Sequence, residues 1–170
     1  AYVAVGSSAR AFVFNNTSSL SSCPMCFATS TLSLGAEAQE DIEVLLQVLW
    51  PAVCDPQAWV YFHNPCAGKR LRLTPTQEAA CDSWIRCHSP EAFKWKSILV
   101  HVNALYSWHE HLHNEGKSLL VGLTDFCGGE LEIHGETPYA VSGRMIIFDG
   151  RRKHKTHIFS GLRVTLVAFT

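Results

Sequence analysis

The sequence predicts a mainly β protein with helices in its N-terminal half (α+β), built around an antiparallel sandwich or barrel. From residue 97 onward, short β-rich runs alternate with Gly, Asn and Pro. Segments with helical periodicity occur only before that point. The chain has 170 residues, 47% hydrophobic and 17% charged, which is enough apolar material for one domain of ordinary size.

The strongest helix signal lies at residues 36–49. Its apolar side chains recur at spacings of three and four, which places them on one face of a helix. They are Ile42, Leu45, Leu46 and Leu49. Pro51 follows this run, and proline cannot donate the backbone hydrogen bond that continues a helix. The sequence therefore predicts that this helix ends before residue 51.

A second helix and three short strands complete the first half. The segment TPTQ at residues 74–77 is typical of a helix start, with proline in the first turn, and residues 79–87 form the predicted body. Apolar runs at residues 2–5, 11–14 and 58–62 predict short strands.

Six β-rich runs follow in the second half, and their close spacing favours antiparallel pairing. They are residues 98–106, 118–123, 130–134, 139–141, 145–148 and 162–170. We therefore divide the chain into a supporting region with helices, residues 1–96, and a β core, residues 97–170. The two are expected to form one folding unit.

Charge and cysteine content narrow the functional classes. The net charge of −1 provides no global basic field to attract nucleic acid or an anionic membrane. Apolar stretches are far too short for a membrane span. The seven cysteines are odd in number and scattered, which does not favour a disulfide framework and favours an intracellular reducing compartment. The organelle is not specified.

Histidine marks the candidate site, because seven of the nine histidines lie between residues 97 and 170. On a strand or its end, His109 and His111 project from one face and can converge on one metal ion. A third ligand must come from elsewhere, and His154 and His157 are the candidates. Imidazole ligands suit iron, zinc, copper or nickel, so the ligand type alone does not select the metal.

Five motifs in order make the second half resemble the core of the 2-oxoglutarate- and iron(II)-dependent oxygenases. These are H-E-H at residues 109–111, D-F-C-G-G-E-L at 125–131, F-D-G at 148–150, then His154, and R-V-T at 163–165. That family carries H-x-D, a turn of the type G-D-F-x-G-G-E-L, a distal His and an Arg-x-Ser/Thr strand. The resemblance implies a double-stranded β-helix, or jelly-roll, core.

The resemblance also implies two cofactors and the residues that hold them. Fe(II) is expected at His109, His111 and His154. The guanidinium of Arg163 is expected to pair with the distal carboxylate of 2-oxoglutarate in a bidentate way, and the Thr165 hydroxyl to add a hydrogen bond.

One departure from the family pattern is His111, which stands where the family has the Asp ligand. Three neutral imidazoles leave a divalent ion with one more positive charge than two imidazoles and a carboxylate. Three interpretations remain open at this point. The three-histidine site is active with altered chemistry, Glu110 supplies a carboxylate, or the site is degenerate.

The expected function is therefore a 2-oxoglutarate-dependent oxygenase that hydroxylates a substrate the sequence does not identify. An alternative is a catalytically inactive barrel that serves as a structural or accessory subunit of a larger protein complex, favoured by the changed ligand, the short chain and the low charge content. A second alternative is a three-histidine cupin-like metalloprotein, which has no need for a buried Arg163. Some family members act on nucleic acid bases, but the near-neutral charge gives a nucleic acid substrate little support.

Overall fold

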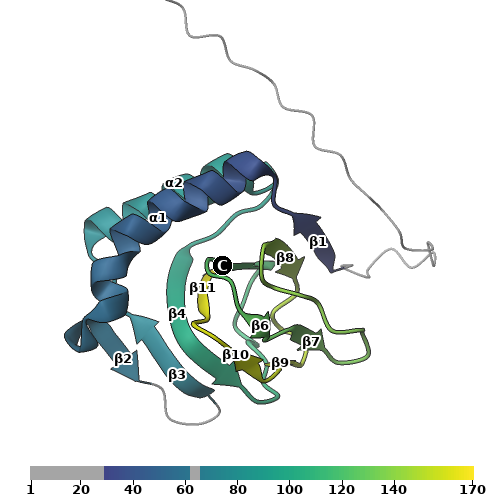
Figure 1. Cartoon of the computed structure of the whole chain (residues 1–170). Helices are drawn as coiled ribbons and strands as arrows, with labels where there is room; N and C mark the ends of the chain where they lie inside the picture. Colours follow the sequence, from purple (N-terminus) through teal and green to yellow (C-terminus); the bar gives the residue numbers. More distant parts are fainter. Residues whose placement is uncertain (1–28, 62–65) are drawn as a thin grey trace, which may run out of the picture.

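A computed structural model describes residues 29–61 and 66–170 of the chain. The strands expected at residues 2–5 and 11–14 lie outside these residues. A seven-stranded antiparallel sheet with the order β1-β8-β5-β11-β4-β3-β2 dominates the fold (Figure 1). Its strands are β1 (Ser30–Ser33), β2 (Trp59–Tyr61), β3 (Cys66–Leu71), β4 (Ser97–Tyr106), β5 (Ser118–Gly122), β8 (Arg144–Phe148) and β11 (Val164–Phe169).

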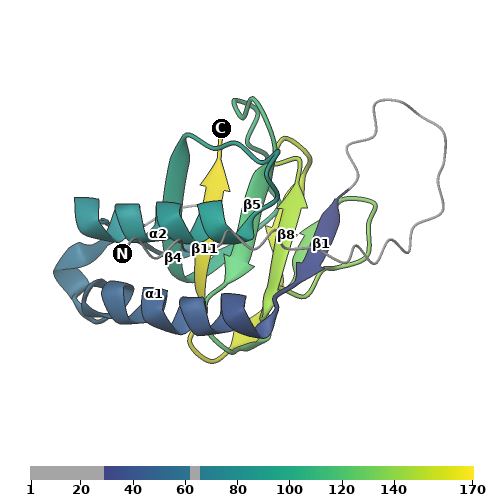
Figure 2. The same ribbon diagram turned by 90° about the horizontal axis from the view of Figure 1, so that it is seen from above.

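Two helices, α1 (Ala36–Cys54) and α2 (Pro75–His88), cover one face of this sheet (Figure 2). The predicted start of α2 is confirmed, since Thr74 and Gln77 form a reciprocal capping box with proline in the first turn. The predicted end of α1 is wrong, because the helix runs through Pro51 to Cys54. Proline removes one helical hydrogen bond there, but the extra turn buries Ala52 and Val53 in the core. A three-residue 3₁₀ helix (Pro56–Ala58) then leads into β2.

Strand alternation gives the large sheet two different faces. The helix-facing side is apolar, and its members are buried together with residues of α1 and α2. From the strands they include Leu71, Val100, Val102, Leu119, Val121, Met145, Ile147, Val164, Leu166 and Ala168. The intervening residues face the opposite side, where the barrel closes.

Two small sheets close the barrel on that opposite side. One pairs β6 (Cys127–Gly128) with β10 (Phe159–Ser160), and the other pairs β7 (Leu131–Ile133) with β9 (His154–Thr156). A second apolar cluster fills the space between them and the large sheet. This is the double-stranded β-helix, so the expected fold class is confirmed.

Most strand predictions in the second half hold to within a few residues at each end. Residues 139–141 differ, because Tyr139 makes only an isolated bridge to Leu131. The expected strand at 58–62 begins at Trp59. Strands β1, β3, β6, β9 and β10 were not predicted. Strands β1 to β3 join the sheet formed by later strands. The proposed boundary after residue 96 stays a prediction. Among the described residues, neither helix is long and apolar enough to cross a membrane.

Candidate metal centre and adjoining pocket

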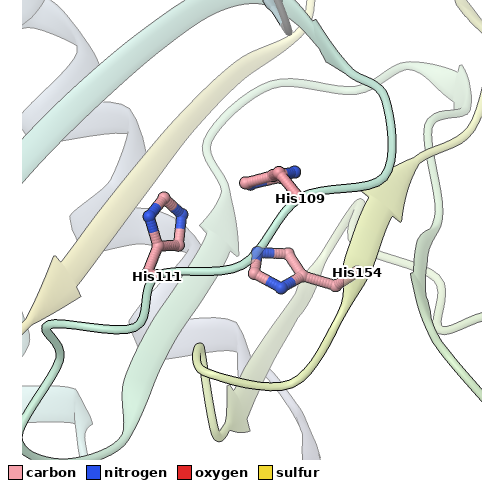
Figure 3. A group of neighbouring side chains, drawn as sticks. All are labelled: His109, His111 and His154. Carbon is pink, nitrogen blue, oxygen red and sulfur yellow. The ribbon is translucent and has the colours of Figure 1, made fainter.

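Three imidazoles from two separate segments meet at one end of the barrel (Figure 3). His109 and His111 lie on the segment that follows β4, and His154 is the first residue of β9. One ring nitrogen from each lies within 4.8 Å of the other two. The expected trio is therefore brought together. The other candidate, His157, instead contacts the Glu132 carboxylate at 2.5 Å through Nε2.

Backbone hydrogen bonds hold these segments in place. His109 and His154 exchange main-chain hydrogen bonds of 2.9 Å, as in a one-residue antiparallel bridge. The His111 amide donates to the Gly150 carbonyl at 2.9 Å. The chain beyond His111 turns, so His113 is exposed and does not join the other two.

Two of the rings are oriented by carbonyl oxygens. His109 Nδ1 lies 2.8 Å from the Ser107 carbonyl oxygen, and His154 Nδ1 lies 2.6 Å from that of Arg152. A carbonyl accepts only, so each Nδ1 carries the hydrogen and each Nε2 keeps its lone pair. This arrangement is typical of metal-binding histidines, whose second ring nitrogen donates to a carbonyl or carboxylate.

Loss of hydration favours the uncharged form of these rings, most strongly for the buried His154 and less for the half-buried His109 and the more exposed His111. Removal from water lowers the pKa of His154 to about 4 and also lowers the pKa of His109. The pKa of His111 is lowered by the same desolvation and by the nearby His109. Neutral imidazole is the form that binds a metal ion.

The donor set therefore fits a divalent transition-metal ion. Metal–nitrogen bonds of about 2.1 Å place neighbouring ligand atoms roughly 3 to 4 Å apart, so the 4.8 Å limit requires only a small inward rotation. Glu110 points into solvent and is not a member of the group. All three donors are thus neutral, and three positions of an octahedral ion would stay open.

A cavity of about 100 Å³ extends from the histidines into the barrel. Its lining includes Arg163, which directly precedes β11, and the pocket-facing residues of β11, of which Thr165 is the first. Both are almost completely buried, at 3% and 0% exposed. The Thr165 hydroxyl has no hydrogen-bond partner among the described residues. A buried hydroxyl without a partner is costly, which is consistent with a ligand group at this position.

The Arg163 guanidinium lies where the barrel is closed. Its terminal nitrogens donate to the carbonyls of Ala104 at 3.3 Å and Gly129 at 3.4 Å. The rings of Phe126 and Phe159 lie 5.3 and 5.6 Å from its central carbon. Such long bonds leave a buried cation well suited to a carboxylate entering from the pocket.

The sequence analysis did not identify two residues of the pocket, His101 and Tyr106. His101 on β4 is 7% exposed, and its Nε2 lies 3.3 Å from the Tyr106 hydroxyl. Tyr106 in turn stacks on His109 with ring centres 4.8 Å apart. Burial, followed by the charges of Arg163 and Arg70, lowers the pKa of His101 to about 3. His101 could have been found only from the pairing of β4 with β11, which places it opposite Thr165. The sequence alone does not reveal that pairing.

The fold is a double-stranded β-helix like that of the 2-oxoglutarate/iron(II) oxygenases, which confirms the resemblance at the level of the fold. Among solved structures, the chain is similar to a prolyl-4-hydroxylase from Pseudomonas putida, with TM-score 0.60, 14% identity, and 83% of this chain and 90% of that chain covered. A Trichoplax adhaerens prolyl hydroxylase, solved with a peptide fragment of the hypoxia inducible factor oxygen degradation domain, gives TM-score 0.59, 14% identity, and coverage of 83% and 82%.

A Burkholderia pseudomallei oxidoreductase of the 2OG-Fe(II) oxygenase family gives TM-score 0.52, 16% identity, and coverage of 83% and 82%. No family model matches the sequence. No curated protein matches it either. At these identities the structural similarity concerns the fold alone.

Proposed function

We propose that this chain is an Fe(II)- and 2-oxoglutarate-dependent oxygenase with a three-histidine metal centre. The observation that carries the proposal is one continuous pocket. At its mouth are three convergent neutral imidazoles, and on its inner wall are a buried guanidinium and a buried hydroxyl without a partner. A dicarboxylate with a 2-oxo group matches both ends of this pocket.

Different residues of the pocket would bind the metal ion and the co-substrate. His109, His111 and His154 would hold the metal on one side and leave its other side open. Arg163 would form charge-assisted hydrogen bonds with the distal carboxylate, and Thr165 would donate a further hydrogen bond. Iron held in this way would supply the redox chemistry by which O₂ converts 2-oxoglutarate to succinate and CO₂ and hydroxylates a C–H bond.

The apolar barrel contributes by excluding water. Between the two polar ends, the pocket wall consists largely of side chains such as Leu120, Leu131 and Phe148. Low local polarity strengthens the Arg163–carboxylate interaction and limits side reactions of the loaded centre.

The replacement of aspartate by His111 affects charge more than geometry. A divalent ion with three neutral ligands keeps its full charge, so an anionic co-substrate is attracted more strongly than in a site that contains a carboxylate. The substrate is not specified by the pocket. The peptide bound to the Trichoplax protein makes a protein substrate worth testing first.

The direct test is metal and co-substrate binding followed by turnover. Purified protein reconstituted anaerobically with Fe(II) should bind one ion per chain and, with 2-oxoglutarate and O₂, form succinate. The His154→Ala variant should lose metal binding by at least about 100-fold, because one of three ligands is removed. Protein that binds neither Fe(II) nor 2-oxoglutarate would contradict the proposal and favour an inactive scaffold.

A matched variant addresses the unusual ligand. His111→Asp restores the family's carboxylate, and an anionic ligand should raise Fe(II) affinity by about tenfold through charge attraction. Metal titration of wild type and variant measures this. Wild-type metal affinity in both His111→Asp and His111→Ala would show that residue 111 does not act as a ligand. Binding of metal without 2-oxoglutarate would instead favour a cupin-like protein.

A further inference from the structure

The segment that leads Arg163 into β11 is held from both sides by side chains outside the metal centre. On one side, Thr124 Oγ1 donates to the Leu162 carbonyl at 2.5 Å and accepts from the Val164 amide at 2.9 Å. On the other side, Asn103 Oδ1 accepts from the Arg163 amide at 2.9 Å. The Asn103 backbone N–H also donates to the Arg163 carbonyl at 2.8 Å.

Asn103 has an unusual backbone for its position. It lies within β4 with φ of 51°, and it is the only described residue other than glycine with positive φ. Asparagine tolerates this left-handed conformation better than most residues, but it still carries a cost. The β3–β4 register shifts at the same place, between Ala67 and Lys69. A Cβ at Gly68 would lie 2.3 Å from the Ala104 Cα, so the two backbones touch there.

This irregularity changes which groups of β4 face Arg163. Leu99 and His101 line the pocket, and strict alternation would turn Asn103 inward as well. Asn103 is instead exposed and Ala104 is buried. The bulge thus presents the Asn103 amide oxygen to the Arg163 main chain and the Ala104 carbonyl to its guanidinium. Strained backbone of this kind tends to persist where function requires it.

We propose that Asn103 and Thr124 are positioning residues that fix the depth and direction of the Arg163 guanidinium, and so control affinity for the distal carboxylate of 2-oxoglutarate without touching it. This inference rests on the proposed function. Neither side chain lines the pocket. Their effect passes through the main chain on both sides of residue 163.

The test compares two 2-oxo acids on Fe(II)-loaded protein by anaerobic calorimetry. 2-Oxoglutarate has the distal carboxylate, and pyruvate lacks it. Asn103→Gly keeps the positive φ but removes the acceptor, and Thr124→Val keeps the shape but removes the hydroxyl. Each should weaken 2-oxoglutarate binding by about tenfold, the usual effect of losing an outer partner of a ligand-binding group. Pyruvate binding should change by less than about twofold.

Conservative variants supply the rescue. Asn103→Asp keeps an acceptor oxygen and Thr124→Ser keeps the hydroxyl, so each should bind 2-oxoglutarate within about threefold of wild type. Thr74→Val is a matched control, because it removes a side-chain-to-backbone hydrogen bond at the start of α2, far from the pocket. It should lower the melting temperature without changing the affinity of either acid.

Two results would overturn the inference while leaving the proposed function intact. One is wild-type 2-oxoglutarate affinity in Asn103→Gly and Thr124→Val, while Arg163→Ala loses it. The other is equal weakening of both acids, which would indicate general loosening of the structure. If wild-type protein fails to bind 2-oxoglutarate, or Arg163→Ala binds it normally, the proposed function fails and the inference fails with it.

Discussion

The two faces of the large sheet are built from alternate residues of the same strands, yet they have different tasks. In β11, Val164, Leu166 and Ala168 pack against the helices and are fully buried apolar side chains. The alternate positions face the pocket. Thr165 in β11 and Arg163 directly before it are polar but also buried, at 0% and 3% exposed. Adjacent residues of the same strand thus belong either to the apolar core or to the lining of the pocket.

The same division holds in neighbouring strands. On β4, Val100 and Val102 join the helix-facing core while His101 faces the pocket. On β5, Leu119 and Val121 do the same while Ser118 lines the pocket near the histidines. A continuous apolar layer behind the pocket lets costly buried polar groups persist, because the layer supplies the free energy that those groups lack.

The largest expected effect is on the helix-facing side. Leu166→Ala should lower the free energy of unfolding by about 3 kcal/mol, because it leaves a cavity at a site with 0% exposure. Val167→Ala, one residue further and half-buried on the pocket side, should cost about 1 kcal/mol. Urea unfolding of both variants measures the difference. Equal losses would show that the two faces contribute alike to stability.

An effect of intermediate size concerns the pH dependence of stability caused by the buried His101 on the pocket side. His101 has a pKa of about 3 in the folded protein, against about 6.5 in an unfolded chain. The unfolded state therefore binds the proton more readily as the pH falls below 6.5. Because of His101, the free energy of unfolding should fall by about 2 kcal/mol when the pH is lowered from 7 to 5.

The variant His101→Gln isolates this contribution, because the other histidines with lowered pKa values are present in both proteins. Its unfolding free energy should depend less steeply on pH than that of wild type, whatever its absolute stability. Parallel curves for the two proteins would contradict the assignment of a buried neutral His101.

The smallest effect should separate binding from stability at a single hydroxyl. Thr165→Val removes a group without a protein partner, so the free energy of unfolding of the free protein should stay within about 0.5 kcal/mol or rise. Affinity for 2-oxoglutarate should fall at least about tenfold, the value of one hydrogen bond to a charged acceptor. Calorimetry and urea unfolding together measure both. Unchanged affinity would remove Thr165 from the pocket's ligand contacts.

Much of the fold could be predicted from the sequence because its helices and central strands are specified by residues close together in the chain. The spacing from Ile42 to Leu49 and the capping box at Thr74 define helices within a few neighbouring residues. Strands β4, β5, β8 and β11 are apolar enough to be recognised alone. Strand β3 carries Lys69 and Arg70, and its pairing with β4 rather than its composition makes it a strand.

The candidate site divides in the same way. The sequence by itself determined which residues are candidates for the chemistry, since His109, His111, His154, Arg163 and Thr165 stand in motifs that can be read along the chain. Only the tertiary structure decided that the three imidazoles meet, that His101 shares their pocket, and that a bulge at Asn103 holds Arg163. Such contacts join residues far apart in sequence, and their geometry follows from strand register and bulges, which depend on the packing of the whole barrel.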